Sequence, residues 1–121
     1  MGFWDRLRDG LAGGMDQTGP AASVSVDLPE VDGICRYRMV FFGRVQGVGF
    51  RYTMKLEAQA LSITGWVHNH YDGSVVAEVQ GENKSIRMLI YRMQESRYIR
   101  INEIKVDSIP TDKREVGFLV K

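Results

Sequence analysis

Residues 36–62 read RYRMVFFGRVQGVGFRYTMKLEAQALS, which is a strand pattern, a glycine-rich turn and a helix pattern in direct succession. Apolar residues alternate at first, as on the buried face of a strand, at Tyr37, Met39 and Phe41. They then recur at intervals of four, four and three residues, as on one face of a helix, at Phe50, Met54, Ala58 and Leu61. These patterns predict a buried strand over about 36–42 and a helix over about 51–62, joined by a loop.

The chain after this helix contains a hairpin, a second helix pattern and two further strand patterns. Asp72-Gly73 is a strong turn signal, so a short strand that begins at Trp66 is expected to pair with Ser74–Val79. Apolar residues at helical spacing follow at Ile86, Leu89, Ile90 and Met93. Residues 101–108 and 116–120 are predicted strands. The order β-α-β-β-α-β plus a C-terminal strand predicts an α+β, ferredoxin-like split βαβ fold, in which two helices cover one face of an antiparallel sheet.

Composition and charge divide the 121 residues into two parts. Residues 1–33 carry two basic and six acidic side chains and are rich in glycine, so we expect a flexible, disordered N-terminal extension. A short amphipathic helix that contacts a partner or a membrane surface is the alternative, from the spacing of Phe3, Trp4, Leu7 and Leu11. Residues 34–121 carry fourteen basic and nine acidic side chains and are expected to form one domain.

The same features narrow the class of protein. A modest positive charge attracts small anions but is far from the basic stripe of a nucleic-acid-binding protein, so no nucleic-acid partner is expected. No apolar run is long enough for a membrane span, and residues 1–6 lack the apolar stretch that a signal peptide would need, so none is expected. Cys35 is the single cysteine. We therefore expect a cytoplasmic, monomeric protein that acts on a small molecule, and the sequence does not identify a partner for the extension.

The glycine-rich loop Gly43–Arg51 is the first candidate for a functional site. Its glycines allow successive backbone N–H groups to converge, and the start of a helix adds further donors and a partial positive charge. Arg51 lies in the predicted first helical turn, where a cation opposes the helix dipole, and this placement suggests a bound anion. Taken alone, the loop is better explained as a simple strand-to-helix turn.

Asn69, at the predicted end of a strand, is the second candidate. Its amide either forms the turn or orients a water molecule or a substrate oxygen. His68 and His70 would lie on one face of the strand and could share a metal ion, but no third ligand lies nearby in the sequence. No metal or cofactor is expected, and solvent-exposed histidines are the simpler interpretation.

Two motifs together resemble the acylphosphatase family: GRVQGVGFR at 43–51, and GWVHN at 65–69 with Gly73, Val75 and Gly81 following it. The resemblance covers about 36–121 and implies the same split βαβ fold. It also implies metal-independent hydrolysis of acyl phosphates, with Arg51 and Asn69 as the catalytic residues. Arg51 would grip the phosphate and Asn69 would orient the attacking water. The phosphate-binding set implied by the family is Gln46, Gly47, Val48, Gly49, Phe50 and Arg51.

Two other functions are open at this point. The domain also resembles the acylphosphatase-like part of larger carbamoyl-transferring maturation proteins, so it could bind a phosphorylated metabolite or a partner without turnover. RNA binding is the second of these alternative hypotheses, because split βαβ sheets also form RNA-recognition domains. That mode needs stacking aromatic residues on the central strands, and Ser74–Val79 contains none.

Overall fold

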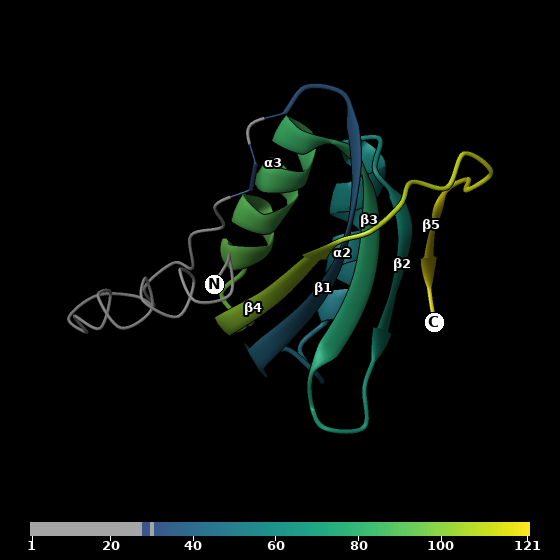
Figure 1. Ribbon diagram of the computed structural model, residues 1–121. Coiled ribbons are helices and arrows are strands. Elements are labelled where there is room, and N and C mark those ends of the chain that lie inside the picture. The colour runs from purple at the N-terminus through teal and green to yellow at the C-terminus, as the bar shows by residue number, and fades with distance from the viewer. Residues whose placement is uncertain (1–27, 30) are drawn as a thin grey trace.

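The computed structural model describes residues 28–29 and 31–121 of the chain (Figure 1). Most of the predicted N-terminal extension, residues 1–33, lies outside the described residues. The element order is β1 (Ile34–Arg44), α2 (Phe50–Ala60), β2 (Thr64–Asn69), β3 (Val75–Glu82), α3 (Asn83–Gln94), β4 (Arg100–Ser108) and β5 (Phe118–Val120). This order confirms the predicted α+β, ferredoxin-like fold. No helix in the described part of the chain is long and apolar enough to cross a membrane.

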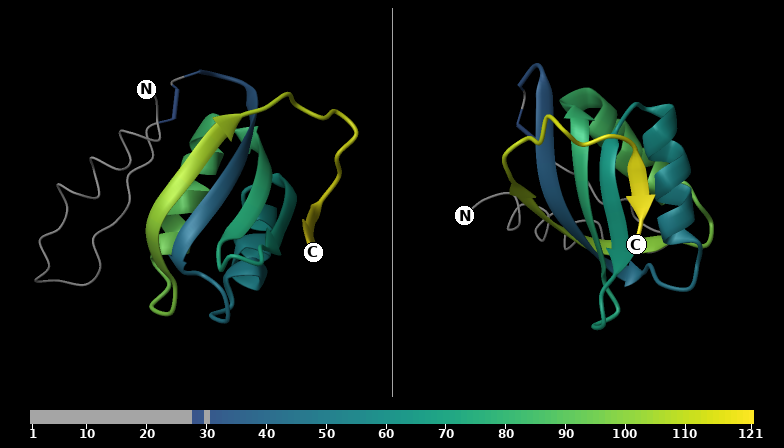
Figure 2. Two further views of the ribbon diagram at one scale, coloured as in Figure 1. Left: turned by 60° about the horizontal axis from the view of Figure 1, so that its bottom comes forward. Right: turned by 90° about the vertical axis from the view of Figure 1, so that its right-hand side faces the viewer.

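The five strands form one sheet in the order β4-β1-β3-β2-β5. The first four strands pair antiparallel, as predicted, but β5 pairs parallel to β2, so the sheet is mixed. The reason is the path of the chain after β4, which leaves one edge of the sheet and crosses to the opposite edge before it reverses (Figure 2). A strand that reverses relative to β4 and lands beside β2 must run in the direction of β2.

The core lies between the two helices and one face of the sheet, and Figure 2 shows both helices on the same side. The predicted alternation in β1 is confirmed, because Tyr37, Met39 and Phe41 are buried, and α2 buries Phe50, Met54 and Ala58. Leu28 is also buried, at 1% exposure, and belongs to the same core cluster. Arg87 donates a hydrogen bond to the Leu28 carbonyl at 2.7 Å. The packed part of the chain therefore includes a residue that precedes β1.

A network of charged side chains around the buried Arg36 holds the crossing segment, residues 109–117, against the face of the sheet that the helices do not cover. Arg36 is 6% exposed and donates to both carboxylate oxygens of Glu115, at 2.6 and 2.9 Å, and to Glu78 at 2.9 Å. Thr64 on β2 donates to the same Glu115 carboxylate at 2.8 Å. The pKa of Arg36 is raised above its ordinary value, and the hydrogen bonds to Glu115 are the main cause. The network therefore ties the segment that precedes β5 to strands β1, β2 and β3.

Candidate active site

The loop between β1 and α2 is glycine-rich and leads directly into the N-terminus of α2. Gly47 and Gly49 have φ angles of +74° and +81°, a region that residues with a side chain rarely adopt. A Cβ at either position would meet nothing within 4 Å, so the backbone conformation and not crowding requires glycine there. Gly49 is also the N-cap of α2, and no side chain caps the helix. The first backbone N–H groups of α2 are thus without the usual side-chain acceptor.

Arg51 lies in the first turn of this helix, and its side chain is held by a contact with Lys121. Its Nη1 atom donates a hydrogen bond to the backbone carbonyl of Lys121 at 2.8 Å. Lys121 is itself attached to the sheet, because its backbone N–H donates to the Val67 carbonyl at 2.8 Å. No side-chain carboxylate of the described residues pairs with Arg51, and the first turn of α2 contains no acidic residue. The Arg51 guanidinium thus faces the site beside a main-chain oxygen, with no acidic side chain of the described residues paired to it.

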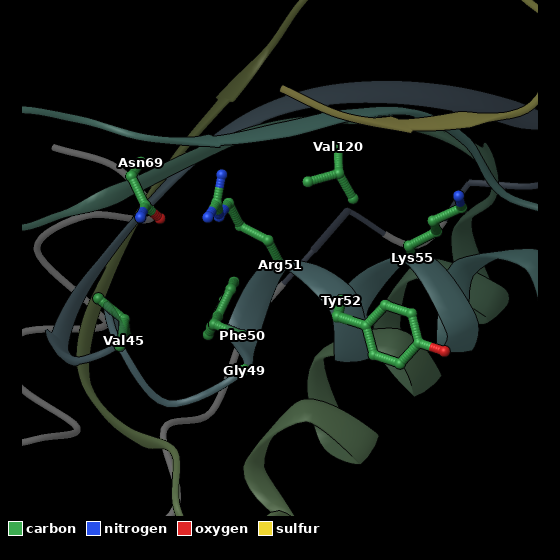
Figure 3. Close-up of a pocket in the computed structure, with 9 residues that line it drawn as sticks. Val45, Gly49, Phe50, Arg51, Tyr52, Lys55, Asn69 and Val120 are labelled. Carbon is green, nitrogen blue, oxygen red and sulfur yellow. The ribbon is translucent and has the colours of Figure 1, made fainter.

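Asn69, the last residue of β2, faces Arg51 across a hollow of about 340 Å³ (Figure 3). The residues that line the hollow come from the loop, α2, β2 and β5: Val45, Gly47, Gly49, Phe50, Arg51, Tyr52, Lys55, Asn69 and Val120. Both predicted catalytic residues are therefore brought to one hollow. Of the predicted phosphate-binding residues, Gly47, Gly49, Phe50 and Arg51 line it. Gln46 and Val48 do not.

The Gln46 side chain points instead to the turn between β2 and β3. Its Nε2 atom donates to the carbonyls of His70 and Ser74, at 2.7 and 2.8 Å. Asp72 orders the same turn by accepting hydrogen bonds from the hydroxyl and the backbone N–H of Ser74, at 2.6 and 2.9 Å. These hydrogen bonds from Ser74, with a smaller contribution from His70, lower the pKa of Asp72 to about 2. Gln46 thus ties the glycine-rich loop to the turn that follows Asn69.

A second hollow, of about 320 Å³, adjoins the first and shares Arg51 and Asn69 with it. Its other lining residues are Trp66, His68 and Lys121. The Lys121 ammonium lies over the Trp66 ring, 4.4 Å from its centroid. The His68 ring also packs against the Trp66 ring, with 5.4 Å between the two ring centroids.

The charge around the two hollows is positive. Arg51, Lys55 and Lys121 line them, and neither hollow is lined by an acidic side chain of the described residues. His68 and His70, considered above as metal ligands, belong to no group of three His, Cys, Asp or Glu residues that could hold a metal ion in the described part of the chain. The Nδ1 atom of His70 lies 3.0 Å from the Oδ1 atom of Asp72. The arrangement is suited to binding an anion.

Sequence reasoning missed the contribution of the C-terminal residues to this site. Val120 lines the first hollow, and the carbonyl of Lys121 accepts the hydrogen bond from Arg51. A strand was predicted over 116–120, but nothing in its residue pattern indicates which strand it joins. The parallel pairing of β5 with β2 is what places both residues beside α2.

Comparisons with known proteins show which proteins the chain resembles. The family model described as Acylphosphatase matches residues 37–120. An acylphosphatase of Clostridium acetobutylicum is 38% identical over 86 residues, which are 70% of this chain and 94% of that protein. The crystal structure of acylphosphatase from Bacillus subtilis superimposes with a TM-score of 0.67 and 30% identity, covering 72% of this chain and 98% of that one. Full-length HypF in its phosphate- and nucleotide-bound form gives a TM-score of 0.63 and 30% identity, covering 78% of this chain but 12% of HypF.

Proposed function

This chain belongs to the acylphosphatase family and is an acylphosphatase, a hydrolase of acyl phosphates, and we propose that the hollow between Arg51 and Asn69 is its active site. The observation that carries the proposal is the convergence of three kinds of group on one hollow. They are the glycine-rich loop at the uncapped start of α2, the Arg51 guanidinium, and the Asn69 amide.

In this proposal the substrate phosphate binds between the loop and Arg51. A phosphate at the start of α2 accepts hydrogen bonds from backbone N–H groups of the loop and the first helical turn, residues 46–51, and is stabilised by the helix dipole. Arg51 can donate to two phosphate oxygens at once, and its guanidinium carries a positive charge. Because phosphoryl transfer needs mainly positioning and charge neutralisation, these groups supply most of what the reaction requires.

Asn69 is proposed to orient the attacking water. Its amide is not a base, but it can hold a water molecule in line with the bond that breaks. The oxygen of that water forms a bond to phosphorus as the bond between phosphorus and the acyl oxygen breaks. The electron pair of the broken bond leaves with the carboxylate, and the water protons remain on the phosphate or pass to solvent. A carboxylate is a good leaving group, so no nucleophilic side chain and no metal ion is needed in this mechanism.

The test is phosphate release from benzoyl phosphate, with EDTA present to remove metal ions. We expect Arg51→Ala to lower kcat/KM by about 10³-fold, since it removes the charge that neutralises the phosphoryl group. Asn69→Ala should lower kcat by about 10²-fold with a smaller effect on KM. Exposed residues of the same types, changed in Arg97→Ala and Asn102→Ala, serve as matched controls and should keep the parent rate.

The outcomes separate the alternatives. Loss of activity in Arg51→Ala and Asn69→Ala, with EDTA-resistant hydrolysis by the parent chain, supports the proposed site and metal independence. Parent rates in both variants would refute the assignment. Binding of the phosphate group without turnover would instead favour a binding module of the same fold.

A further inference from the structure

The position of Asn69 relative to Arg51 predicts where the acyl group of the substrate lies. This inference rests on the proposed function, in which Asn69 holds the attacking water. Displacement at phosphorus places the attacking and leaving oxygens on opposite sides, roughly in line. Figure 3 shows Asn69 on one side of the Arg51 guanidinium, and Tyr52, Lys55 and Val120 on the other. The leaving acyl group should therefore extend along the first hollow toward this second group of residues, all of which line it.

Lys55 supplies a positive charge on this side of the hollow. It lies four residues after Arg51 on α2, so the two side chains share a helix face and are about 6 Å apart along the axis. The Lys55 side chain is half-buried, and no side chain of the described residues forms an ion pair with its ammonium. Lys121, by contrast, is engaged with the Trp66 ring in the second hollow. Lys55 is therefore available to a ligand in the first hollow.

The other two residues on this side give the acyl group an apolar surface. Tyr52 is 64% exposed and Val120 is 41% exposed, although both residues line the hollow. Tyr52 directly follows Arg51 on the helix, and Val120 approaches from β5. A carbon skeleton that leaves the phosphate in this direction can contact both residues and end near the Lys55 ammonium.

We propose that Lys55 is a specificity-determining residue that selects acyl phosphates whose acyl group carries a second negative charge. Arg51 and the loop bind the phosphate end, which every acyl phosphate shares. Lys55 interacts only with what lies beyond the carbonyl group. Acyl groups with a terminal carboxylate or phosphate are therefore preferred over neutral acyl groups of the same size.

The test compares 4-carboxybenzoyl phosphate with 4-carbamoylbenzoyl phosphate, which have nearly the same shape but differ by one charge on the acyl group. Each kcat/KM is divided by the rate of uncatalysed hydrolysis, so that intrinsic reactivity cancels. We expect the parent chain to prefer the carboxylate by about 3-fold, the size expected for a partly exposed ion pair. Lys55→Gln should bring this ratio to about 1, and Lys55→Glu should reverse it. Half-molar salt should weaken the preference of the parent chain, because it screens the pair.

Lys105→Gln is the matched control. Lys105 is exposed on β4, at the opposite edge of the sheet from β5, so this variant makes the same change in net charge far from the hollow. It should keep the parent ratio, which excludes general attraction by the field of the protein as the cause. An unchanged ratio in Lys55→Gln, or an equal loss in Lys105→Gln, would overturn the inference. If benzoyl phosphate hydrolysis itself does not depend on Arg51, the proposed site fails as well, whereas Arg51-dependent hydrolysis without a Lys55 effect refutes only the acyl-group assignment.

Discussion

Glu115 ties the C-terminal segment to the sheet, and we expect Glu115→Ala to lower both stability and activity. The variant removes a carboxylate that accepts two hydrogen bonds from the buried Arg36 guanidinium and one from Thr64. Hydrogen bonds to charged groups contribute about 1.5–3 kcal/mol each, but Arg36 keeps its bond to Glu78, and water can enter the vacated space. We therefore expect the free energy of unfolding to fall by about 3 kcal/mol, and the Tm by roughly 12 °C or more.

The effect on activity follows from the position of β5. This strand has three residues, Phe118–Val120, and among the described strands it pairs with β2 alone. Glu115 lines neither hollow, yet it holds the segment that delivers Val120 and the carbonyl of Lys121 to the site. Glu115→Ala should therefore lower kcat/KM for benzoyl phosphate by about tenfold at a temperature where the variant is folded, since small displacements of positioning groups cost one to two orders of magnitude.

Equilibrium urea denaturation measures the stability change, and steady-state kinetics measures the change in activity. Glu82→Ala is the control, because Glu82 and Lys84 form an exposed pair at 3.5 Å that contributes less than about 1 kcal/mol. Glu115→Gln keeps the side-chain volume and one acceptor oxygen, and should recover part of the stability. The reasoning is wrong if Glu115→Ala costs no more stability than Glu82→Ala, or if it is destabilised while kcat/KM stays at the parent value.

Two further predictions concern the core and the turn after Asn69. Burial is the main cause that raises the pKa of Tyr37 to about 12. The contribution of Tyr37 to the free energy of unfolding should therefore be constant below about pH 9, where the tyrosine is protonated in both states, and should fall by about 2–3 kcal/mol as the pH approaches 12. Urea denaturation across this range should show the fall in the parent chain and not in Tyr37→Phe. Gln46→Ala removes the donor to the carbonyls of His70 and Ser74, and should lower kcat several-fold with KM nearly unchanged, because it loosens the turn next to Asn69. A higher KM with the parent kcat would show instead that the Gln46 side chain contacts the phosphate.

Local patterns predicted most of the elements because they report which side chains are buried. The alternation of Tyr37, Met39 and Phe41 gave the inner face of β1 correctly. The predicted helix over 51–62 is observed at Phe50–Ala60. It ends earlier because Ser62 adopts a φ of +58° and the backbone N–H of Ile63 donates to Ala58. Such terminal geometry depends on the following chain and leaves no trace in the apolar spacing.

Features that depend on distant parts of the chain could not be predicted in this way. Arg36 occupies an outward-facing position in the strand pattern, yet it is buried because the segment after β4 crosses over it. The direction of β5 depends on the same crossing. The Lys121 carbonyl is a backbone group that any residue would supply, so its side chain carries no signal for the contact with Arg51. The motifs indicated Arg51 and Asn69, but not the groups that hold them in place.

The distribution of charge explains why the anchoring groups lie outside the hollow. A carboxylate beside Arg51 or Lys55 would stabilise the empty site, but it would compete with the substrate for the same cations. The described chain instead holds Arg51 through a main-chain oxygen of Lys121, and the buried guanidinium that pairs with acidic side chains is Arg36, on the face of the sheet away from the helices. The ion pairs of Arg36 with Glu78 and Glu115 thus stabilise the fold at a place where a bound anion does not have to compete with them. The cations at the hollow therefore remain available to an anion. Because Arg51 is held by the segment that follows β5, its position depends on the correct docking of β5.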